Sequence, residues 1–138
     1  MGILLEIKNL SIEYKSIKDG EKNSVTAVKN VSMKINKGEI YALAGESGCG
    51  KSTLAKAITK LVPIKSGDIL FEGKSILTQT KPDSKNYPRC VQMVFQNPHS
   101  SLNPKMKIGD TLREPLDINT KLTNAEKSKL ISEVLDDV

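Results

Sequence analysis

The chain has 138 residues, a net charge of +5 and a hydrophobic content of 38%. This length suits one domain or part of one, and the core must be mainly aliphatic, because the sequence holds only two Phe, three Tyr and no Trp. There is no long apolar run and no N-terminal leader pattern, so we expect neither a transmembrane helix nor a secretory signal. The aromatic, zinc-finger and basic-arm patterns of nucleic-acid-binding modules are also missing, so we expect no nucleic-acid partner.

The N-terminal part of the chain predicts two strands. Residues 4–14 and 25–35 alternate apolar and polar side chains, as half-buried strands do. The polar stretch 16–24 between them predicts an exposed loop, and residues 36–39 predict a turn. Together these features predict a small antiparallel β-subdomain that packs on a parallel core.

The next stretch predicts a phosphate-binding site. Residues 40–44 are apolar and predict a buried strand, and residues 52–61 carry apolar side chains at helical spacing. Between them, residues 45–52 match the pattern G-x-x-x-x-G-K-[ST] at every fixed position. In the order strand, glycine-rich loop, helix, the backbone amides of the loop and the positive end of the helix dipole face an anion.

The motif assigns a role to each of its residues. Lys51 would reach the β- and γ-phosphates of a nucleotide, and the Ser52 hydroxyl would be a ligand of Mg²⁺. The alternative is a glycine-rich turn that binds nothing. The residues predicted to bind phosphate are Gly45, Glu46, Ser47, Gly48, Cys49, Gly50, Lys51 and Ser52.

The middle of the chain predicts two more strands. Residues 68–73 predict a short strand and residues 91–95 a second buried strand. Residues 78–88 are polar and hold Pro82, Asp83 and Pro88, which predicts a loop. We expect Cys90 to belong to this apolar strand, whereas Cys49 lies in the phosphate loop. The two cysteines have neither metal-ligand spacing nor a CxxC pattern, which suits free thiols in a reducing cytosol.

Two helices are predicted near the C-terminal end. Residues 108–113 predict a helix that stops at Pro115. Thr123 and Glu126 have the spacing of a capping box, which predicts the start of a second helix. The apolar face of this helix would consist of Leu130, Ile131, Val134, Leu135 and Val138.

Residues 134–137 permit a second interpretation. The sequence Val-Leu-Asp-Asp resembles the apolar run followed by an acid that holds Mg²⁺ in phosphate-loop enzymes. However, Ser132 and Glu133 interrupt the apolar run, and the capping box upstream sets a helical period. We therefore expect an exposed helix end here and not a metal site.

The stretch 94–104, Val-Phe-Gln-Asn-Pro-His-Ser-Ser-Leu-Asn-Pro, resembles the Q-loop region of ABC transporter ATPases. Within that family it is most similar to the oligopeptide, dipeptide and nickel importer branch, and in detail to its F-type subunit. The same resemblance is carried by residues 27–32, 37–39, 45–54 and 107–116.

The resemblance implies roles for individual residues. Tyr14 would stack on adenine, and the loop from Gly45 to Thr53 would hold the phosphates and Mg²⁺. Gln96 would sense Mg²⁺ and the γ-phosphate, and Lys51 and Gln96 would be the catalytic residues. The segment His99–Lys107 would lie near the transmembrane permease. The alternatives are an ordinary strand aromatic for Tyr14, a turn residue for Gln96 and a solvated loop side chain for His99.

The resemblance also implies an α/β fold, the P-loop NTPase core of an ABC ATPase with an antiparallel β-subdomain. Residues 1–96 would form the N-terminal part of this core, and residues 97–138 the start of a helical subdomain. The family's Leu-Ser-Gly-Gly-Gln signature, the strand that ends in Asp-Glu and the switch histidine are not in the sequence. We therefore expect a truncated, N-terminal piece of an ATPase.

The implied function is the ATP-binding subunit of a peptide or nickel importer, at the cytoplasmic face of the membrane. Its partners would be a second ATPase subunit and the permease subunits. We expect this chain to bind ATP and Mg²⁺ without hydrolysing ATP by itself. Two alternatives stay open, a non-enzymatic nucleotide-binding fragment and another phosphate-loop enzyme such as a GTPase or kinase. The D-x-x-G and [NT]-K-x-D patterns of a GTPase are not found after the loop.

Overall fold

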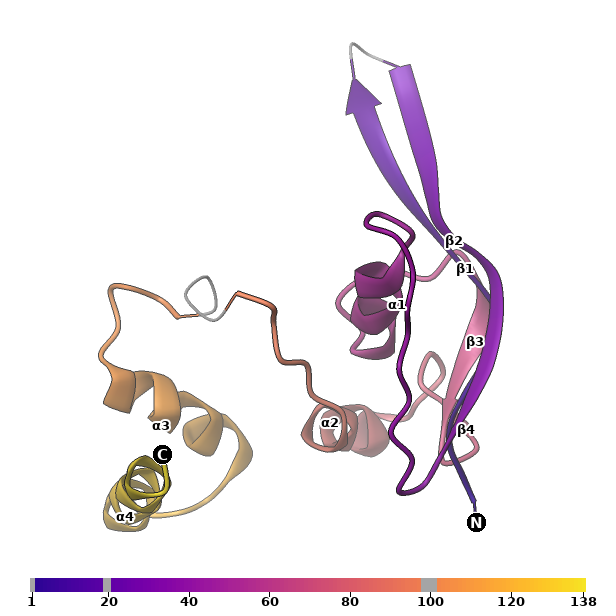
Figure 1. Ribbon diagram of the computed structural model, residues 1–138. Helices are drawn as coiled ribbons and strands as arrows, with labels where there is room; N and C mark the ends of the chain where they lie inside the picture. Colours follow the sequence, from indigo (N-terminus) through magenta and orange to yellow (C-terminus); the bar gives the residue numbers. More distant parts are fainter. Residues whose placement is uncertain (1, 19–20, 98–101) are drawn as a thin grey trace. The chain divides into compact units, whose positions relative to one another are not determined.

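The computed structural model describes residues 2–18, 21–97 and 102–138. The chain divides into two compact units, Met1–Met93 and Val94–Val138, and each is described by itself (Figure 1). In the described residues, the first unit contains a β-sheet and two helices, and the second contains two helices. Among the described residues, no helix is long and apolar enough to cross a bilayer.

The sheet of the first unit has four strands in the order β2-β1-β3-β4. They are β1 (Ile3–Lys18), β2 (Glu21–Asn36), β3 (Ser66–Phe71) and β4 (Lys74–Ser75). All neighbouring strands are antiparallel. The predicted antiparallel β-subdomain and the strand at 68–73 are therefore confirmed.

The predicted exposed loop at 16–24 is largely wrong. Strand β1 continues to Lys18 and pairs with Glu21, the first residue of β2, so the two strands form one long hairpin. Pairing depends on backbone groups, so it can continue where both strands have become polar. Residues 19 and 20 lie outside the described residues.

The β1–β2 pair bends where two asparagines adopt the left-handed backbone conformation. Asn9 has φ 47° and Asn30 has φ 51°, and the register of the pair shifts between Ile7 and Leu10. The Asn9 amide donates to Ser32 Oγ at 2.9 Å, and the Asn30 amide donates to Ser11 Oγ at 3.0 Å. Asparagine tolerates this conformation better than most residues, and each serine satisfies an amide displaced from the ladder.

One side of the sheet carries the core. Figure 1 shows helices α1 (Lys51–Ile58) and α2 (Lys81–Cys90) on the same side of the strands. The buried side chains come from β1, β2, β3, the two helices and the segment after β4: Leu5, Ile7, Leu10, Ile12, Val28, Leu54, Ala57, Ile69, Ile76 and Tyr87. The predicted helix at 52–61 is confirmed, and it ends three residues earlier than expected.

Tyr87 connects α2 to the rest of the core. Its hydroxyl donates to the carbonyl oxygen of Ile58 at 2.6 Å, and its ring meets Phe71 edge to face with 5.4 Å between the ring centroids. The Lys60 ammonium lies 5.0 Å from the centroid of the Tyr87 ring. Burial raises the pKa of the Tyr87 hydroxyl to about 12.

Helix α2 occupies most of the predicted loop at 78–88, so that prediction is wrong. Its two prolines were read as loop signals, but Pro82 falls in the first turn, where a missing N–H costs nothing. Pro88 lies inside the last turn, close to where the helix ends at Cys90. Cys90 is therefore a helical residue and not part of a strand.

The strands predicted at 40–44 and 91–95 are not formed. Both segments are irregular, and Ile40 and Val94 are 97% and 96% exposed. A strand exists only when a neighbour pairs with its backbone, and the four strands of the described chain form an antiparallel sheet without these segments. The predicted parallel core is thus absent from the residues that the structure describes.

The second unit consists of helices α3 (Ile108–Asn119) and α4 (Asn124–Asp136). The prediction that α3 stops at Pro115 is wrong, because the helix continues through this proline for four more residues. The capping box is confirmed: the Thr123 amide donates to Glu126 Oε2 at 2.7 Å, and the Glu126 amide donates to Thr123 Oγ1 at 3.4 Å.

Helix α4 ends at Asp136, so the interpretation of residues 134–137 as a helix end is confirmed. Within the described ranges, no group of three or more His, Cys, Asp or Glu side chains could hold a metal ion. The predicted apolar face stays half exposed, since Val134 and Leu135 are 52% and 49% accessible.

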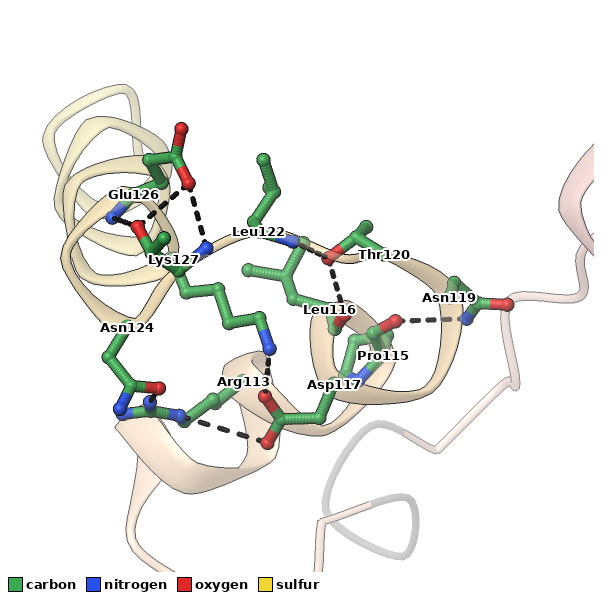
Figure 2. Close-up of polar contacts among 11 residues, drawn as sticks. Arg113, Pro115, Leu116, Asp117, Asn119, Thr120, Leu122, Asn124, Glu126 and Lys127 are labelled. Carbon is green, nitrogen blue, oxygen red and sulfur yellow. Dashed lines mark hydrogen bonds and ion pairs between the residues drawn. The ribbon is translucent and has the colours of Figure 1, made fainter.

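Polar contacts hold α3 and α4 together (Figure 2). Lys127 is 9% exposed, and its ammonium donates to Asp117 Oδ1 at 2.7 Å. Arg113 Nε lies 3.7 Å from Asp117 Oδ2. The hydrogen bond from Lys127 holds the pKa of the Asp117 carboxyl below its usual value. Arg113 also donates to the side-chain oxygen of Asn124 at the start of α4.

Candidate functional site

The phosphate loop is folded around the Lys51 side chain. The Lys51 ammonium donates to the carbonyl oxygens of Gly45 at 2.6 Å and Glu46 at 2.7 Å, and lies 3.5 Å from Cys49 Sγ. The Cys49 amide donates to the Glu46 carbonyl at 3.3 Å, which closes the turn. The segment is therefore curled, and its lysine points into the loop and not away from it.

Gly50 joins the loop to both the helix and the sheet. It is the N-cap residue of α1 and has φ 98°, a backbone conformation that favours glycine. A Cβ atom at this position would lie 2.3 Å from the carbonyl oxygen of Ala27 on β2. Gly50 thus lets the loop pack directly against the backbone of β2.

The first turn of α1 presents backbone donors. The first i→i−4 bond of the helix runs from the Leu54 amide to the Gly50 carbonyl at 2.9 Å. The amides of Lys51, Ser52 and Thr53 precede this bond and have no acceptor within the helix. The N-cap glycine has no side chain to cap them, and the first turn holds no acidic residue. This helix start suits an anion.

Space is available around the loop. A hollow of about 420 Å³ is lined by residues of β2, by Leu43 and Ala44 and by the loop itself. The Ser52 side chain is exposed. A serine hydroxyl fits one position in the oxygen shell of Mg²⁺, and phosphate oxygens and water would have to supply the others.

The structure brings Tyr14 to the same helix. Tyr14 lies on β1 opposite Val25 of β2, and its hydroxyl donates to Thr53 Oγ1 at 3.4 Å. The ring is 40% exposed. Tyr14 and Thr53 are both predicted to contact the nucleotide through the family resemblance alone, and the contact between them has no signal in the sequence.

A second hollow, of about 550 Å³, adjoins Tyr14. It is lined by Glu13, Tyr14, Lys15, Pro63, Ile64 and Lys65. Lys65 and Glu13 form an ion pair, and the hydrogen bond from Lys65 holds the pKa of the Glu13 carboxyl below its usual value. This pair is not predicted from the sequence, because charged residues far apart along the chain give no local signal.

The other predicted site residues lie in the second unit or outside the described residues. Gln96 is exposed, belongs to the second unit and follows an irregular segment instead of a strand. Lys107 is the N-cap residue of α3, and His99 lies outside the described residues. The predicted roles of Gln96 and of the segment His99–Lys107 stay predictions.

Comparison with known proteins gives a family. The family model described as "ABC transporter" matches residues 28–138. An oligopeptide transport ATP-binding protein, OppF, of Streptococcus mutans is 40% identical over 134 residues, which are 96% of this chain and 42% of the relative. A di/tripeptide transport ATP-binding protein, DppF, of Pseudomonas aeruginosa is 44% identical over 111 residues, or 80% of this chain and 34% of the relative.

A solved structure shares the fold. The dimeric post-hydrolysis state of the ATP-binding cassette MJ0796, bound to ADP and Pi, matches with a TM-score of 0.74 and 23% identity. The match covers 96% of this chain and 56% of that one. The predicted α/β class with an ABC ATPase fold is thereby confirmed. Because the family match includes the phosphate loop and all that follows it, the chain belongs to the ABC transporter family.

Proposed function

We propose that this chain is the nucleotide-binding part of an ATP-binding subunit that powers the import of peptides. The observation that supports this most is the curled loop with Lys51 inside it, placed at a helix start whose amides are uncapped. The relatives that this chain resembles are named as oligopeptide and di/tripeptide transport ATP-binding proteins. The chain spans less than half the length of these relatives, so transport is a property proposed for the longer protein.

The geometry suggests how a nucleotide would bind. The Lys51 ammonium would exchange the carbonyl oxygens of Gly45 and Glu46 for phosphate oxygens, which carry more negative charge. The amides of residues 51–53 would donate to the same phosphates, and Tyr14 would contact the base. Mg²⁺, when bound with the nucleotide, would neutralise phosphate charge, and the Ser52 hydroxyl would be its protein ligand here.

We further propose that this chain binds ATP but does not hydrolyse it by itself. Removing a γ-phosphate requires a group that positions the attacking water and groups that stabilise the transition state. Of the predicted catalytic residues, Lys51 lies in the loop and Gln96 in the second unit. The proposed activity of the chain by itself is ATP binding, with hydrolysis left to the assembled subunit.

The proposed partners are a second ATP-binding subunit and the permease subunits, the latter contacted through His99–Lys107. The proposed location is the cytoplasmic face of the membrane. The non-enzymatic alternative, an interaction fragment that binds nucleotide, is favoured by one observation, the exposed apolar residues at 40–44 and 91–95. The family match argues against the GTPase and kinase alternatives.

The test is a calorimetric titration with Mg²⁺ and ATP. Wild type should bind, and Lys51→Ala should weaken binding by at least about tenfold, as expected for a lost charged hydrogen bond. Lys56→Ala, which removes a lysine from the last turn of the same helix, is the matched control and should leave the affinity unchanged. Equal affinities for wild type and Lys51→Ala would refute the proposal.

A further inference from the structure

We infer that Thr53 is a positioning residue for the nucleotide base, because its hydroxyl holds the Tyr14 ring at the phosphate loop. The inference rests on the proposed function and adds a physical link between base binding and phosphate binding. In that function Tyr14 contacts the base and the helix start binds phosphate. The hydrogen bond from Tyr14 Oη to Thr53 Oγ1 joins them across 39 positions of sequence.

The hydrogen bond from Tyr14 to Thr53 matters because it acts on the Tyr14 ring itself, whereas the neighbouring ion pair of Glu13 with Lys65 holds only the adjacent residue of β1. Beyond Ile12, the described residues of β1 pair only with β2, and Tyr14 and Val25 are 40% and 64% exposed. An exposed tyrosine samples several rotamers, and restricting it at the moment of binding costs conformational entropy. A ring already held by a hydrogen bond avoids part of that cost.

Thr53 is well suited to hold the ring. It is half-buried in the first turn of α1, next to Leu54, which is 5% exposed and packs into the core. Its side chain is β-branched and therefore has few rotamers in a helix. The Tyr14 ring is thus hydrogen-bonded to helix α1, and Tyr14 lines the hollow of about 550 Å³. That volume lies within the range of ligand pockets.

The hydrogen bond to Thr53 gives the Tyr14 hydroxyl a role, since stacking on a base requires only the ring. Phenylalanine would present the same aromatic face. The hydroxyl contributes the bond to Thr53, whose own amide is one of the three uncapped donors at the helix start. One residue would therefore contact the phosphates through its backbone and orient the base through its side chain.

The test compares ATP with inorganic tripolyphosphate, which carries the phosphates without the nucleoside. For each protein, the dissociation constant for tripolyphosphate divided by that for ATP measures the contribution of the base and sugar. This ratio cancels any direct effect of Thr53 on phosphate. Tyr14→Phe and Thr53→Val should each lower the ratio about two- to tenfold, the range for one hydrogen bond. Thr53→Ser keeps the hydroxyl and should retain the wild-type ratio.

The double variant Tyr14→Phe/Thr53→Val decides whether the two residues act as a pair. The inference expects its ratio to equal that of either single variant, because one bond can be lost only once. An unchanged ratio in Thr53→Val, or losses that multiply in the double variant, overturns the inference while the proposed function stands. If wild type binds neither ligand, the proposed function fails, and the inference fails with it.

Discussion

The ammonium of Lys51 lies 2.6 Å from the carbonyl oxygen of Gly45, at the other end of the same loop. This bond holds the loop in its curled shape. A lysine held in this way needs no large rearrangement to reach an anion at the helix start. The bond also implies that Lys51 has a small structural role in addition to its binding role.

Gly50→Ala should destabilise the first unit by more than the backbone conformation alone explains. An alanine in the left-handed region costs about 1–2 kcal/mol. In addition, the new Cβ would lie 2.3 Å from the Ala27 carbonyl oxygen, so β2 or the loop must shift. Urea unfolding would measure the loss in the free energy of unfolding.

Gly73→Ala is the matched control for this change. Gly73 has φ 79°, and a Cβ atom there would meet nothing within 4 Å. Gly73→Ala therefore has the backbone cost without the steric clash. The difference between the two variants in the free energy of unfolding measures the cost of the clash with β2. Equal losses for both variants would contradict the packing described for Gly50.

Tyr87→Phe should destabilise the first unit by about 1–3 kcal/mol, because it leaves a carbonyl oxygen without its hydrogen-bond donor in a buried site. The variant keeps the edge-to-face contact with Phe71 and loses only the 2.6 Å bond to Ile58. Thermal or urea unfolding would measure the effect. Tyr41→Phe is the control, since Tyr41 is 44% exposed, and it should change stability little.

The same tyrosine predicts a loss of stability at high pH. Its pKa in the folded chain is raised to about 12 from an ordinary value of 10.0, so the folded state favours the protonated hydroxyl. This contribution is complete below pH 10, declines as the unfolded state begins to lose its proton, and is gone once pH exceeds the folded value. Wild type should thus lose more stability than Tyr87→Phe between about pH 10 and pH 12. Parallel curves would show that Tyr87 is not the group responsible.

Thr123→Ala should fray the start of α4 and cost about 0.5–2 kcal/mol, the usual range for a lost N-cap side chain. The hydrogen bond from the Thr123 backbone holds the pKa of the Glu126 carboxyl below its usual value. The stabilisation from Glu126 is therefore present above pH 4.5 and is lost as pH falls through the lowered folded value.

Far-UV circular dichroism as a function of pH would measure the helical content of the chain, and with it the fraying in Thr123→Ala and the acid transition of Glu126. Ser128→Ala, an exposed position inside the same helix, is the control and should retain the acid transition of wild type. Thr123→Ala keeps the backbone amide that donates to Glu126 and loses only the bonds of the hydroxyl, so its acid transition should be weakened and not abolished. Loss of the transition in Ser128→Ala, or a helical content of Thr123→Ala equal to that of wild type, would contradict the capping geometry.

The exposed apolar segments predict self-association. Ile40 and Val94 are 97% and 96% exposed, and apolar segments without pairing partners favour contact with other chains. Ile40→Lys/Val94→Lys should lower association in sedimentation velocity without lowering the free energy of unfolding. Val138→Lys replaces a residue that is 100% exposed outside both segments and should leave association unchanged. If Val138→Lys reduced association equally, the added positive charge and not the loss of the apolar side chains would explain the effect.

Local patterns predicted much of this structure. The alternation at 4–14 and 25–35, the helix after the phosphate loop and the capping box at Thr123 each depend on near neighbours in sequence, and the structure confirms them. Helix α2 was missed because prolines were read as breakers regardless of position, although Pro82 falls where a helix accepts one.

Elements that depend on distant residues were predicted poorly. The strands expected at 40–44 and 91–95 need pairing partners that a local pattern cannot supply, and the described chain does not provide them. The contacts of Tyr14 with Thr53 and of Lys65 with Glu13 join residues far apart in sequence, so only the folded chain shows them.

The most direct test of phosphate binding by the loop is a backbone amide NMR titration with Mg²⁺ and ATP. The account predicts that the largest shift changes occur at residues 46–53, with smaller changes at Tyr14, and that Lys51→Ala reduces these changes at the same subsaturating ATP concentration. Saturable binding of ATP that leaves the amides of residues 46–53 unchanged, or that shifts amides elsewhere instead, would contradict it.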